Sequence, residues 1–248
     1  MPFSDEQLLR YSRQILVQEF DIAGQEALAN ARVLLIGVGG LGCPAALYLA
    51  AAGIGHLYLA DDDEVDLSNL QRQILFNQSQ LQTPKVTAAK DSLTAINSDT
   101  QITCLQQRAD ESLLESLNDK LDLVLDCSDN AATRLLVNRS CFKAKLPLVS
   151  GAAIRWEGQL TSFDFRESQG PCYQCLFGDI SDSEMNCSEN GIISPVVGII
   201  GVSQALEAIK IISRTGTVSF NTLRCFDGLS GEWRSFNYSQ NSDCPVCR

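Results

Sequence analysis

Four of the ten cysteines in this 248-residue chain form two Cys-x-x-Cys pairs. One pair is Cys172 with Cys175, and the other is Cys244 with Cys247. Four thiolates are the usual ligands of a closed, tetrahedral structural Zn²⁺ site. The alternative, a redox-active dithiol, needs one pair standing alone beside a helix start. The two pairs together therefore predict a zinc site that joins the last residues to the middle of the chain.

Cys187 belongs to neither pair and lies in a polar, acidic segment, residues 178–191, bounded by glycines. An exposed thiol there could be a nucleophile that accepts an acyl group or sulfur. The alternative is an incidental surface cysteine, and the nearby carboxylates would raise its pKa and so oppose its reactivity. The other cysteines fall in apolar or helical contexts typical of a core: Cys43, Cys104, Cys127, Cys141 and Cys225.

A G-x-G-x-x-G sequence follows a short apolar run, residues 32–36, that is typical of a buried strand. An alanine-rich helix is expected over residues 43–52, and a second strand over residues 56–60. Glycines let the backbone approach a phosphate, the helix start offers unpaired N–H groups, and an acid about 20 residues on can bind ribose hydroxyls. The predicted nucleotide ligands are Gly37, Gly39, Gly40, Gly42, Asp61 and Asp63.

A dense polar cluster with one cation follows, namely Ser68, Asn69, Arg72 and Gln73. Further on, Thr83 and Pro84 indicate a helix start, with Thr83 as the N-cap and Lys85 behind it. A cation is disfavoured at a helix N-terminus unless an anion is present, so Lys85 suggests phosphate binding. A G-x-G-x-x-G sequence alone usually indicates NAD or FAD, but these polar groups suit a triphosphate better than a nicotinamide.

Asp129 and Asn130 come after another predicted strand, residues 121–125, and before a helix expected over residues 131–145. In doubly wound sheets, ligands bind beyond the carboxyl ends of the strands. Asp129 is therefore placed to hold Mg²⁺, which prefers carboxylate, water and phosphate oxygens. The alternative role of Asp129 is the N-cap of that helix, and both roles could hold together.

The first residues predict a helical arm. Ser4 and Gln7 have the spacing of a capping box, and a helix is expected over residues 8–20. This helix carries Arg10 and Arg13 and has no place in the predicted sheet. Such an arm could reach into a site, including one on a neighbouring subunit. On the residues alone, solvated helix charges are the favoured explanation.

The order of the elements predicts an α/β fold with a Rossmann-like mixed sheet. Its parallel, nucleotide-binding half would contain strands at residues 32–36, 56–60, 102–105, 121–125 and 147–150. After Trp156 the pattern changes to strands without crossover helices, which would add antiparallel strands at residues 158–165, 223–226 and 232–238. We expect a single domain, 1–248, made of an N-terminal helical arm (1–30), a nucleotide-binding half (31–155) and a half with the structural zinc (156–248).

Composition excludes several classes of function. The net charge is −11 and no basic stripe occurs, so we expect no nucleic-acid binding, while an acidic surface for a partner protein is allowed. The one long apolar stretch, residues 195–213, carries Gln204, Glu207 and Lys210 on one polar stripe. We interpret it as a core or interface helix and expect no membrane span. With no signal or transit peptide, the expected location is cytoplasmic.

Together these residues resemble the HesA/MoeB/ThiF family, the bacterial relatives of ubiquitin-activating enzymes. The resemblance runs from Arg10 to Cys247 and covers the glycine loop, residues 68–73, Lys85, residues 126–130 and both Cys-x-x-Cys pairs. It implies ATP-dependent adenylation of the C-terminal Gly-Gly carboxylate of a ubiquitin-like sulfur carrier protein. Sulfur from a donor protein would then convert the adenylate to a thiocarboxylate. MoaD-like carriers of molybdopterin synthesis and ThiS-like carriers of thiamine synthesis both remain open.

The resemblance also implies roles for individual residues. For the nucleotide and its metal these are Gly39 and Gly40 at the backbone contact, Asp61 at the ribose, Asn69, Arg72 and Lys85 at the phosphates, and Asp129 at Mg²⁺. Arg13 resembles an arginine that reaches across a homodimer to the phosphates. Cys187 resembles the candidate for a covalent link with the carrier, whose binding surface would lie in residues 156–248.

Two other functions compete with adenylation. A nicotinamide-dependent oxidoreductase would use the same glycine loop and Asp61, but it leaves Arg72, Lys85, Asp129 and the zinc pairs without a role. A non-catalytic, zinc-bearing binding scaffold would catalyse no reaction, so none of these residues would affect turnover.

Overall fold

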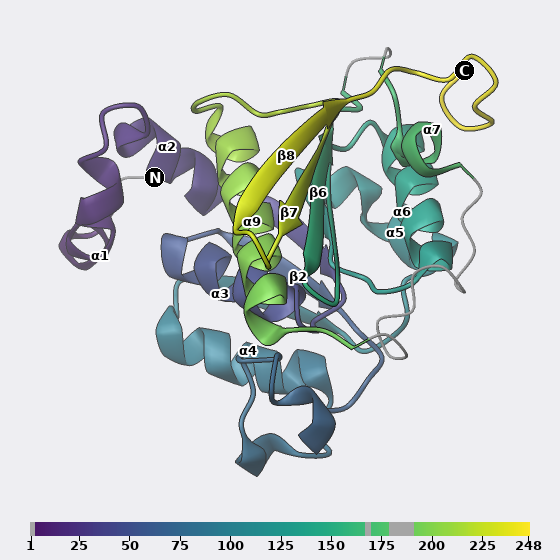
Figure 1. Ribbon diagram of the computed structural model, residues 1–248. Coiled ribbons are helices and arrows are strands. Elements are labelled where there is room, and N and C mark those ends of the chain that lie inside the picture. The colour runs from purple at the N-terminus through teal and green to yellow at the C-terminus, as the bar shows by residue number, and fades with distance from the viewer. Residues whose placement is uncertain (1–2, 167–169, 179–190) are drawn as a thin grey trace.

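The computed structural model describes residues 3–166, 170–178 and 191–248. Its centre is an eight-stranded sheet in the order β3-β2-β1-β4-β5-β6-β7-β8, with helices on both faces (Figure 1). The strands are β1 (Arg32–Ile36), β2 (His56–Ala60), β3 (Gln101–Leu105), β4 (Leu123–Asp126), β5 (Leu148–Ile154), β6 (Glu157–Phe163), β7 (Thr222–Asp227) and β8 (Glu232–Asn237). The helices are α1 (Asp5–Ile15), α2 (Asp21–Asn30), α3 (Gly42–Ala52), α4 (Lys85–Ile96), α5 (Glu111–Leu117), α6 (Ala131–Ala144), α7 (Tyr173–Phe177) and α9 (Ser194–Ser213). The predicted α/β, Rossmann-like mixed sheet is confirmed.

Strands β1 to β5 are parallel to one another. β1 lies between β2 and β4, so the strand order reverses at this point. From Val33 and Leu123 onward, both strands at the reversal are buried, as their unbroken apolar runs predict. The loops that follow β1 and β4 therefore emerge side by side at the carboxyl edge of the sheet, where ligands of doubly wound folds bind.

Strands β5 to β8 pair antiparallel, which confirms the predicted change of pattern. The change occurs at the turn Arg155–Trp156, next to the predicted boundary between the two halves. β5 continues past the predicted end at Ser150 to Ile154. It does so because Gly151 lets the strand pass close to α9: a Cβ there would lie 2.5 Å from the side chain of Gln204.

The helices form two layers with separate apolar cores. α2, α3, α4 and α9 lie on one side of the sheet, and α5, α6 and α7 lie on the other (Figure 1). Leu35 of β1 belongs to the first core together with Ile200, and Leu34 belongs to the second core together with Val137. Alternate residues of the central strand thus anchor opposite layers, as the two-residue period of a strand requires.

α9 has the length and hydropathy of a membrane-spanning helix, but half of its apolar window is buried inside the fold. It packs against α3, β5 and β6. Gln204 is fully buried, and its Nε2 donates to the carbonyl oxygens of Asp126 at 2.8 Å and Val149 at 3.4 Å. Glu207 is buried as well. Gln204 therefore satisfies backbone oxygens in the core, and Glu207 pairs with Lys210 at 2.7 Å. Both are core groups and not a solvated stripe, so the interpretation as a core helix is confirmed.

The N-terminal arm contains two helices, so the single helix predicted over residues 8–20 is wrong. α1 ends at Ile15, and the chain turns before α2 begins. Asp21 has a left-handed backbone with φ +46°, which prevents one continuous helix.

Tyr11 fixes this arm to the body. It is 3% exposed, and its hydroxyl accepts a hydrogen bond from Asn97 Nδ2 at 2.8 Å. Asn97 is the C-cap of α4 and also donates to the Ala50 carbonyl oxygen in α3. The predicted capping box of Ser4 and Gln7 opens α1.

Two glycines of α9 give a matched test of its packing. A Cβ on Gly201 would lie 2.2 Å from the Leu41 carbonyl oxygen, whereas a Cβ on Gly198 would meet nothing within 4 Å. We expect Gly201→Ala to lower the free energy of unfolding by about 2 kcal/mol, because α9 must move away from α3. The control Gly198→Ala should leave it unchanged or raise it by roughly 0.5–1 kcal/mol. Urea denaturation measures both, and equal stabilities would contradict this packing.

Candidate functional site

The glycine loop leaves β1 directly beside the loop that follows β4. Gly37 has φ +87°, and a Cβ there would lie 2.8 Å from the Cys127 carbonyl oxygen. A Cβ on Gly42, at the start of α3, would lie 2.0 Å from the Gly37 carbonyl oxygen. Only glycine fits these two positions. Gly39 and Gly40, between them, line the cleft at this edge, as expected for backbone that approaches a phosphate.

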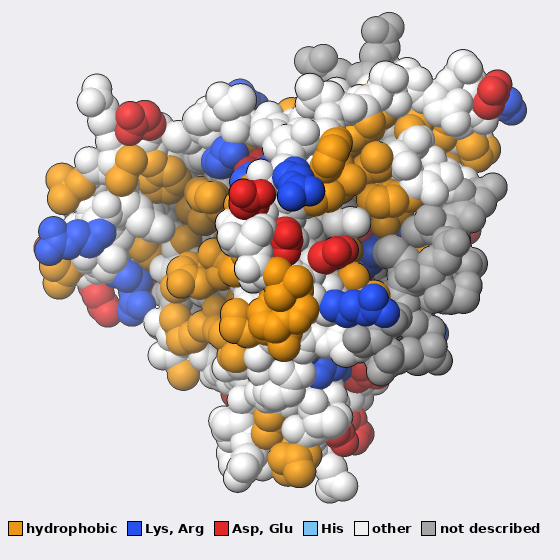
Figure 2. Space-filling view, viewed as in Figure 1, with side chains coloured by type: hydrophobic (Ala, Val, Ile, Leu, Met, Phe, Trp, Pro, Cys, Tyr) orange, Lys and Arg blue, Asp and Glu red, His pale blue; other side chains and the backbone are white. Residues whose placement is uncertain are grey.

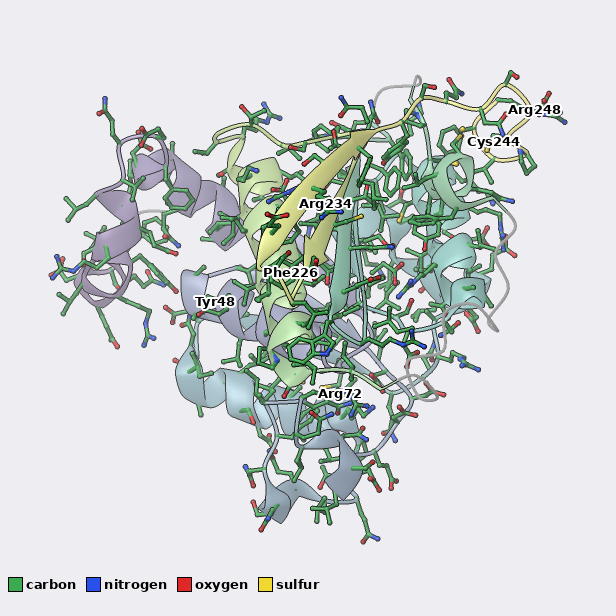
Figure 3. All side chains as sticks on the ribbon, in the orientation of Figure 1. Tyr48, Arg72, Phe226, Arg234, Cys244 and Arg248 are labelled. Carbon is green, nitrogen blue, oxygen red and sulfur yellow. The ribbon has the colours of Figure 1, made fainter. Side chains whose placement is uncertain are left out.

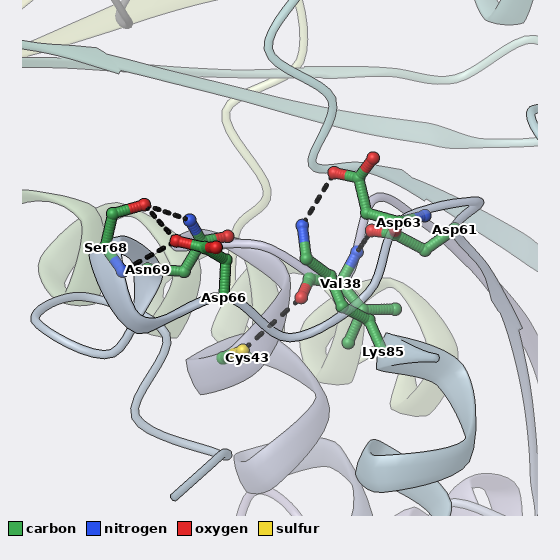
Figure 4. Close-up of polar contacts among 8 residues, drawn as sticks. All are labelled: Val38, Cys43, Asp61, Asp63, Asp66, Ser68, Asn69 and Lys85. Carbon is green, nitrogen blue, oxygen red and sulfur yellow. Dashed lines mark hydrogen bonds and ion pairs between the residues drawn. The ribbon is translucent and has the colours of Figure 1, made fainter. Parts of the chain in front are cut away.

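Asp61 follows β2 and is tied to the glycine loop. Its Oδ2 accepts a hydrogen bond from the Val38 N–H at 2.7 Å, and its Oδ1 accepts one from the Asp63 N–H at 2.9 Å (Figure 4). Burial raises the pKa of the Asp61 carboxyl, while Lys85 and the two N–H groups act in the opposite direction. The carboxylate is thus fixed in one orientation at the position predicted for a ribose ligand.

Lys85 is 4% exposed, and its Nζ bonds to Oδ2 of Asp63 at 2.8 Å (Figure 4). The N-cap of α4 is Pro84, so the predicted cap at Thr83 is wrong. Instead, the Thr83 carbonyl oxygen accepts a hydrogen bond from the Val65 N–H, and this bond holds Thr83 outside the helix. The cation at this helix start is therefore compensated by a carboxylate. An ammonium group has three donors, so Lys85 can hold Asp63 and an anion together.

The polar cluster after β2 folds as the 3-10 helix η1 (Leu67–Asn69) and a turn. Asn69 Nδ2 donates to Ser68 Oγ at 3.1 Å, and Arg72 Nη1 donates to the Ser68 carbonyl oxygen at 3.2 Å. Gln73 is 3% exposed, and its Oε1 has no hydrogen-bond partner within the described part of the chain. A buried amide oxygen without a donor is costly, so this atom marks a place for a donor from a ligand or from water.

The loop after β4 presents Asp129 to the same edge. Asn130 is the N-cap of α6, and its Oδ1 accepts from the Thr133 N–H at 2.9 Å. The alternative role of Asp129 as that cap is therefore wrong, because the helix begins one residue later than such a cap requires. Asp129 is exposed and lines the cleft. Its carboxylate oxygens are hard ligands of the kind that Mg²⁺ prefers.

All of these loops meet in one cleft of about 740 Å³ at the carboxyl edge of the sheet. The predicted residues that line it are Gly37, Gly39, Gly40, Asp61, Asp63, Ser68, Asn69, Arg72, Gln73, Lys85, Asp129 and Asn130. Sequence reasoning assigned no individual role to the other polar residues of its wall, which are Asp62, Gln71, Gln107, Arg108, Ser128, Thr133 and Arg134. Gln107 and Arg108 follow β3 and therefore lie at the same edge of the sheet. This position in the sequence is the signal that could have identified both as residues of the cleft wall.

Three predicted residues are not among the described residues that line this cleft, namely Arg13, Gly42 and Cys187. Arg13 is exposed on α1, which lies well apart from Arg72 (Figures 1 and 3). Cys187 lies outside the described residues. Gly42 is beneath the cleft, where it allows α3 to pack closely on the glycine loop.

The four paired cysteines come together beside α7, and Cys244 lies well apart from Arg72 of the cleft (Figure 3). Their Sγ atoms lie within 4.8 Å of one another, with 3.6 Å between Cys172 and Cys244 and 3.2 Å between Cys175 and Cys247. These distances are too long for disulfides. A tetrahedral ion with Zn–S bonds of about 2.3 Å separates its sulfurs by about 3.8 Å, so the cluster fits Zn²⁺.

The surroundings of Cys244 favour a thiolate. Burial alone would raise the pKa of this thiol, but backbone N–H groups of Cys247 and Val246 and the neighbouring thiols outweigh burial and lower the pKa to about 7. Zinc binds the deprotonated form of cysteine, so these N–H groups support a metal ligand at this position.

Known proteins with similar sequence span nearly the whole chain. The model of the ThiF family matches residues 11–246. The molybdopterin-synthase adenylyltransferase of Escherichia coli (strain K12) is 46% identical over 244 residues, which are 98% of this chain and 98% of that protein. The sulfur carrier protein ThiS adenylyltransferase of the same strain is 48% identical over 244 residues, 98% of this chain and 96% of that protein.

Solved structures support the fold. The crystal structure of E. coli MccB with ATP has a TM-score of 0.82 at 23% identity, over 96% of this chain and 74% of that chain.

Substitutions at Gly39 and Gly42 distinguish an effect on ligand binding from an effect on folding stability. A Cβ on Gly39 would only touch Gln73 Nε2 at 3.7 Å, in contrast to the 2.0 Å approach at Gly42. We expect Gly39→Ala to keep the free energy of unfolding within about 0.5 kcal/mol but to weaken binding of a nucleoside triphosphate about tenfold, because the methyl group faces the phosphate. Gly42→Ala should lose roughly 2–3 kcal/mol of stability. Calorimetric titration that shows normal binding by Gly39→Ala would contradict the assignment.

Metal analysis of the purified protein should find about one Zn²⁺ per chain. We expect Cys244→Ser to lose the metal and several kcal/mol of stability, because the last residues are then no longer held to α7. Cys225→Ser, outside the cluster, is the control and should keep its zinc. A wild-type protein that is folded and free of metal would refute the zinc site.

Proposed function

Because this chain belongs to the ThiF family, we propose that it adenylates the C-terminal Gly-Gly carboxylate of a ubiquitin-like sulfur carrier protein with ATP. A carboxylate oxygen of the carrier attacks the α-phosphorus, pyrophosphate leaves, and the carrier ends in an acyl-adenylate. A sulfur donor protein then supplies the sulfur that displaces AMP and leaves a thiocarboxylate. Two relatives, one named for molybdopterin synthase and one for ThiS, support a MoaD-like or a ThiS-like carrier.

The observation that carries this proposal is the meeting of four groups in one cleft. The glycine loop, Arg72, Lys85 and Asp129 come from four different segments of the chain, yet all line the same space. A glycine loop beside two cations and a metal-binding carboxylate suits a triphosphate with its metal. Hydride transfer to a nicotinamide needs neither the second cation nor the metal ligand, so the oxidoreductase alternative explains less of this cleft.

The proposed chemistry needs no general base, because the nucleophile is already a carboxylate at neutral pH. Its difficulty is the approach of one anion to another and the charge that develops on phosphorus. Arg72 and Lys85 would lower both barriers by holding the phosphate oxygens in fixed positions. The N–H groups of the glycine loop add fixed dipoles that stabilise the same phosphate charge.

Asp129 is the residue that would hold Mg²⁺ in this reaction. Its exposed carboxylate lies in the cleft, and the Asn130 cap fixes the backbone next to it. When bound, Mg²⁺ neutralises phosphate charge and orients pyrophosphate as the leaving group. Asp61, held by two backbone N–H groups, would position the ribose.

We further propose that the protein acts as a homodimer in the cytoplasm, where ATP and the carriers are made. Apolar side chains gather over α1 and over α3 and α9 (Figure 2). Large exposed examples are Leu9, Leu16, Tyr48 and Leu206, each more than half exposed. A second copy would cover this face. Arg13, which is remote from the cleft of its own chain, would then reach the phosphates bound by the partner.

The carrier would bind the antiparallel half of the sheet. β8 is an edge strand with mostly exposed residues, including Phe236, which is 54% exposed. An exposed aromatic on an open sheet face is a common anchor for a partner protein. This face continues toward the carboxyl edge, so a carrier placed there could extend its tail into the cleft.

ATP–pyrophosphate exchange tests the proposed reaction. With Mg²⁺ we expect exchange that depends on a MoaD-like or a ThiS-like carrier, and the carrier that supports it identifies the pathway. Asp129→Asn should lower the exchange rate at least about 100-fold, because the metal loses its anionic ligand. Asp119→Asn, an exposed residue outside the cleft, is the control. Exchange with neither carrier would refute adenylation and would leave a non-catalytic binding scaffold as the remaining function.

Mixed dimers test the proposed role of Arg13. Arg13→Ala and Arg72→Ala should each be inactive alone, since each lacks a cation in both sites. When the two variants are unfolded together and refolded, half of the dimers contain one complete site, so we expect about a quarter of wild-type activity. A mixture as inactive as its components would mean that Arg13 does not act on the partner subunit.

A further inference from the structure

The polar turn that contains η1 brings two side chains of the cleft against the glycine loop. A Cβ on Gly40 would lie 3.4 Å from both Cγ and Cδ of Arg72, so the stem of this arginine lies over the glycine. A Cβ on Gly39 would lie 3.7 Å from Gln73 Nε2. Because the glycine loop is the proposed phosphate contact, the conformation of the turn decides where the guanidinium meets a bound phosphate.

The apolar core holds this turn only at its two ends. Val65 at the start and Leu75 and Phe76 at the end are buried in the core. Between them, Asp66 and Ser68 are exposed. Packing therefore does not fix the middle of the turn, and its conformation depends on hydrogen bonds.

Asp66 provides these hydrogen bonds as the N-cap of η1. Its Oδ1 accepts from the Ser68 N–H at 2.8 Å and from Ser68 Oγ at 2.5 Å (Figure 4). Its carbonyl oxygen accepts from the Asn69 N–H at 3.0 Å. The bonds from the Ser68 hydroxyl and N–H lower the pKa of the Asp66 carboxyl, so the cap is a carboxylate at neutral pH. Asp66 itself is not among the described residues that line the cleft.

Ser68 connects this cap to two polar groups of the cleft. Its Oγ accepts from Asn69 Nδ2 at 3.1 Å (Figure 4), and its carbonyl oxygen accepts from Arg72 Nη1 at 3.2 Å. The hydroxyl proton of Ser68 is already donated to Asp66. Asn69 and Arg72 keep further N–H donors for a ligand, since a side-chain amide has two and a guanidinium has five.

We propose that Asp66 is a positioning residue, which acts through Ser68 to hold Arg72, and with it Asn69, where they meet the phosphates of a bound nucleoside triphosphate. The inference rests on the proposed function for the triphosphate in this cleft. By its charge alone, a carboxylate at this place would oppose the binding of a polyanion. Asp66 therefore favours binding through geometry: without the cap, the ligand itself would have to order the turn and the Arg72 side chain.

Three substitutions of Asp66 separate the cap from the charge. Asp66→Asn keeps the cap and loses the charge, because an amide oxygen accepts the same two hydrogen bonds. Asp66→Glu keeps the charge and loses the cap, because its longer side chain does not place an oxygen at the start of η1. Asp66→Ala loses both. The readout is the affinity for ATP with Mg²⁺, measured by calorimetric titration without carrier, with the melting temperature in parallel.

Asn77→Ala is the matched control. Asn77 caps the next 3-10 helix, η2 (Gln78–Gln80), in the same way: its Oδ1 accepts from the Ser79 N–H at 2.9 Å and from Ser79 Oγ at 2.6 Å. Asn77 is exposed and is not among the described residues of the cleft. Its loss should therefore cost a similar cap without changing ATP binding.

We expect Asp66→Ala and Asp66→Glu to bind ATP about fivefold more weakly than wild type, and Asp66→Asn and Asn77→Ala to bind it within about twofold. All four should melt within about 4 °C of wild type, since each loses at most one exposed cap. A role of charge alone predicts tighter binding by both Asp66→Ala and Asp66→Asn. Tighter or unchanged binding by Asp66→Ala and Asp66→Glu would overturn the proposal.

A double-mutant cycle tests whether the effect passes through Arg72. In the Arg72→Ala background, Asp66→Ala should weaken ATP binding by about twofold or less, because the main group that it positions is gone. An equal fivefold loss in both backgrounds would mean a general loosening of the turn and would refute the role. If Asp66→Ala folds poorly, Asp66→Glu takes its place in the cycle.

The titration uses neither carrier nor turnover, so it separates this inference from the proposed reaction. The expected pattern of ATP affinities, together with no carrier-dependent exchange, would refute adenylation and keep the role of Asp66. A wild-type protein that binds no ATP would overturn both.

Discussion

The close approach of two loops between β1 and β4 is the constraint on which the rest of the structure depends. Gly37 leaves β1 with a left-handed backbone, and its α-carbon stands so near the Cys127 carbonyl that no side chain fits. This contact brings the start of α3 and the loop before α6 to the same edge of the sheet. The glycine loop, proposed to bind phosphate, and the Asp129 carboxylate, proposed to hold Mg²⁺, therefore share one cleft, because the sheet order reverses between these two strands.

Charge inside this cleft is balanced locally, although the chain as a whole carries a net charge of −11. Lys85 is held by Asp63, and Arg134 faces Asp126. Such pairs keep cations in place before an anionic ligand arrives and reduce the reorganisation that binding requires. The acidic surface elsewhere would repel a polyphosphate, so these few fixed cations mark where one can bind.

Much of this arrangement could be predicted from the sequence, because the governing signals are local. Glycine spacing, apolar runs and the residues just after each strand place the Asp61 and Asp129 loops at the carboxyl edge, and the Cys-x-x-Cys spacing identifies the metal cluster. The predictions that are wrong concern positions where a tertiary contact determines the local structure. Thr83 is drawn into a bridge with Val65, Asn130 caps α6 in place of Asp129, and Asp21 divides the N-terminal arm. The sequence places Gln204 on a polar stripe and gives no signal for Arg134, because polar residues within helices are usually exposed. Only the folded chain shows the buried backbone oxygens that these two residues satisfy.

The central claim is that a carboxylate attacks the α-phosphorus of ATP in this cleft, and an isotope label follows that bond directly. A carrier whose terminal carboxylate contains ¹⁸O would be incubated with ATP, Mg²⁺ and enzyme, and the activated carrier discharged with hydroxylamine. Attack on phosphorus moves one carboxylate oxygen into the phosphate of AMP, and hydroxylamine then takes the acyl group by attack at carbon. We predict one ¹⁸O atom in each AMP released. Unlabelled AMP, or AMP formed at the same rate without carrier, would contradict the account.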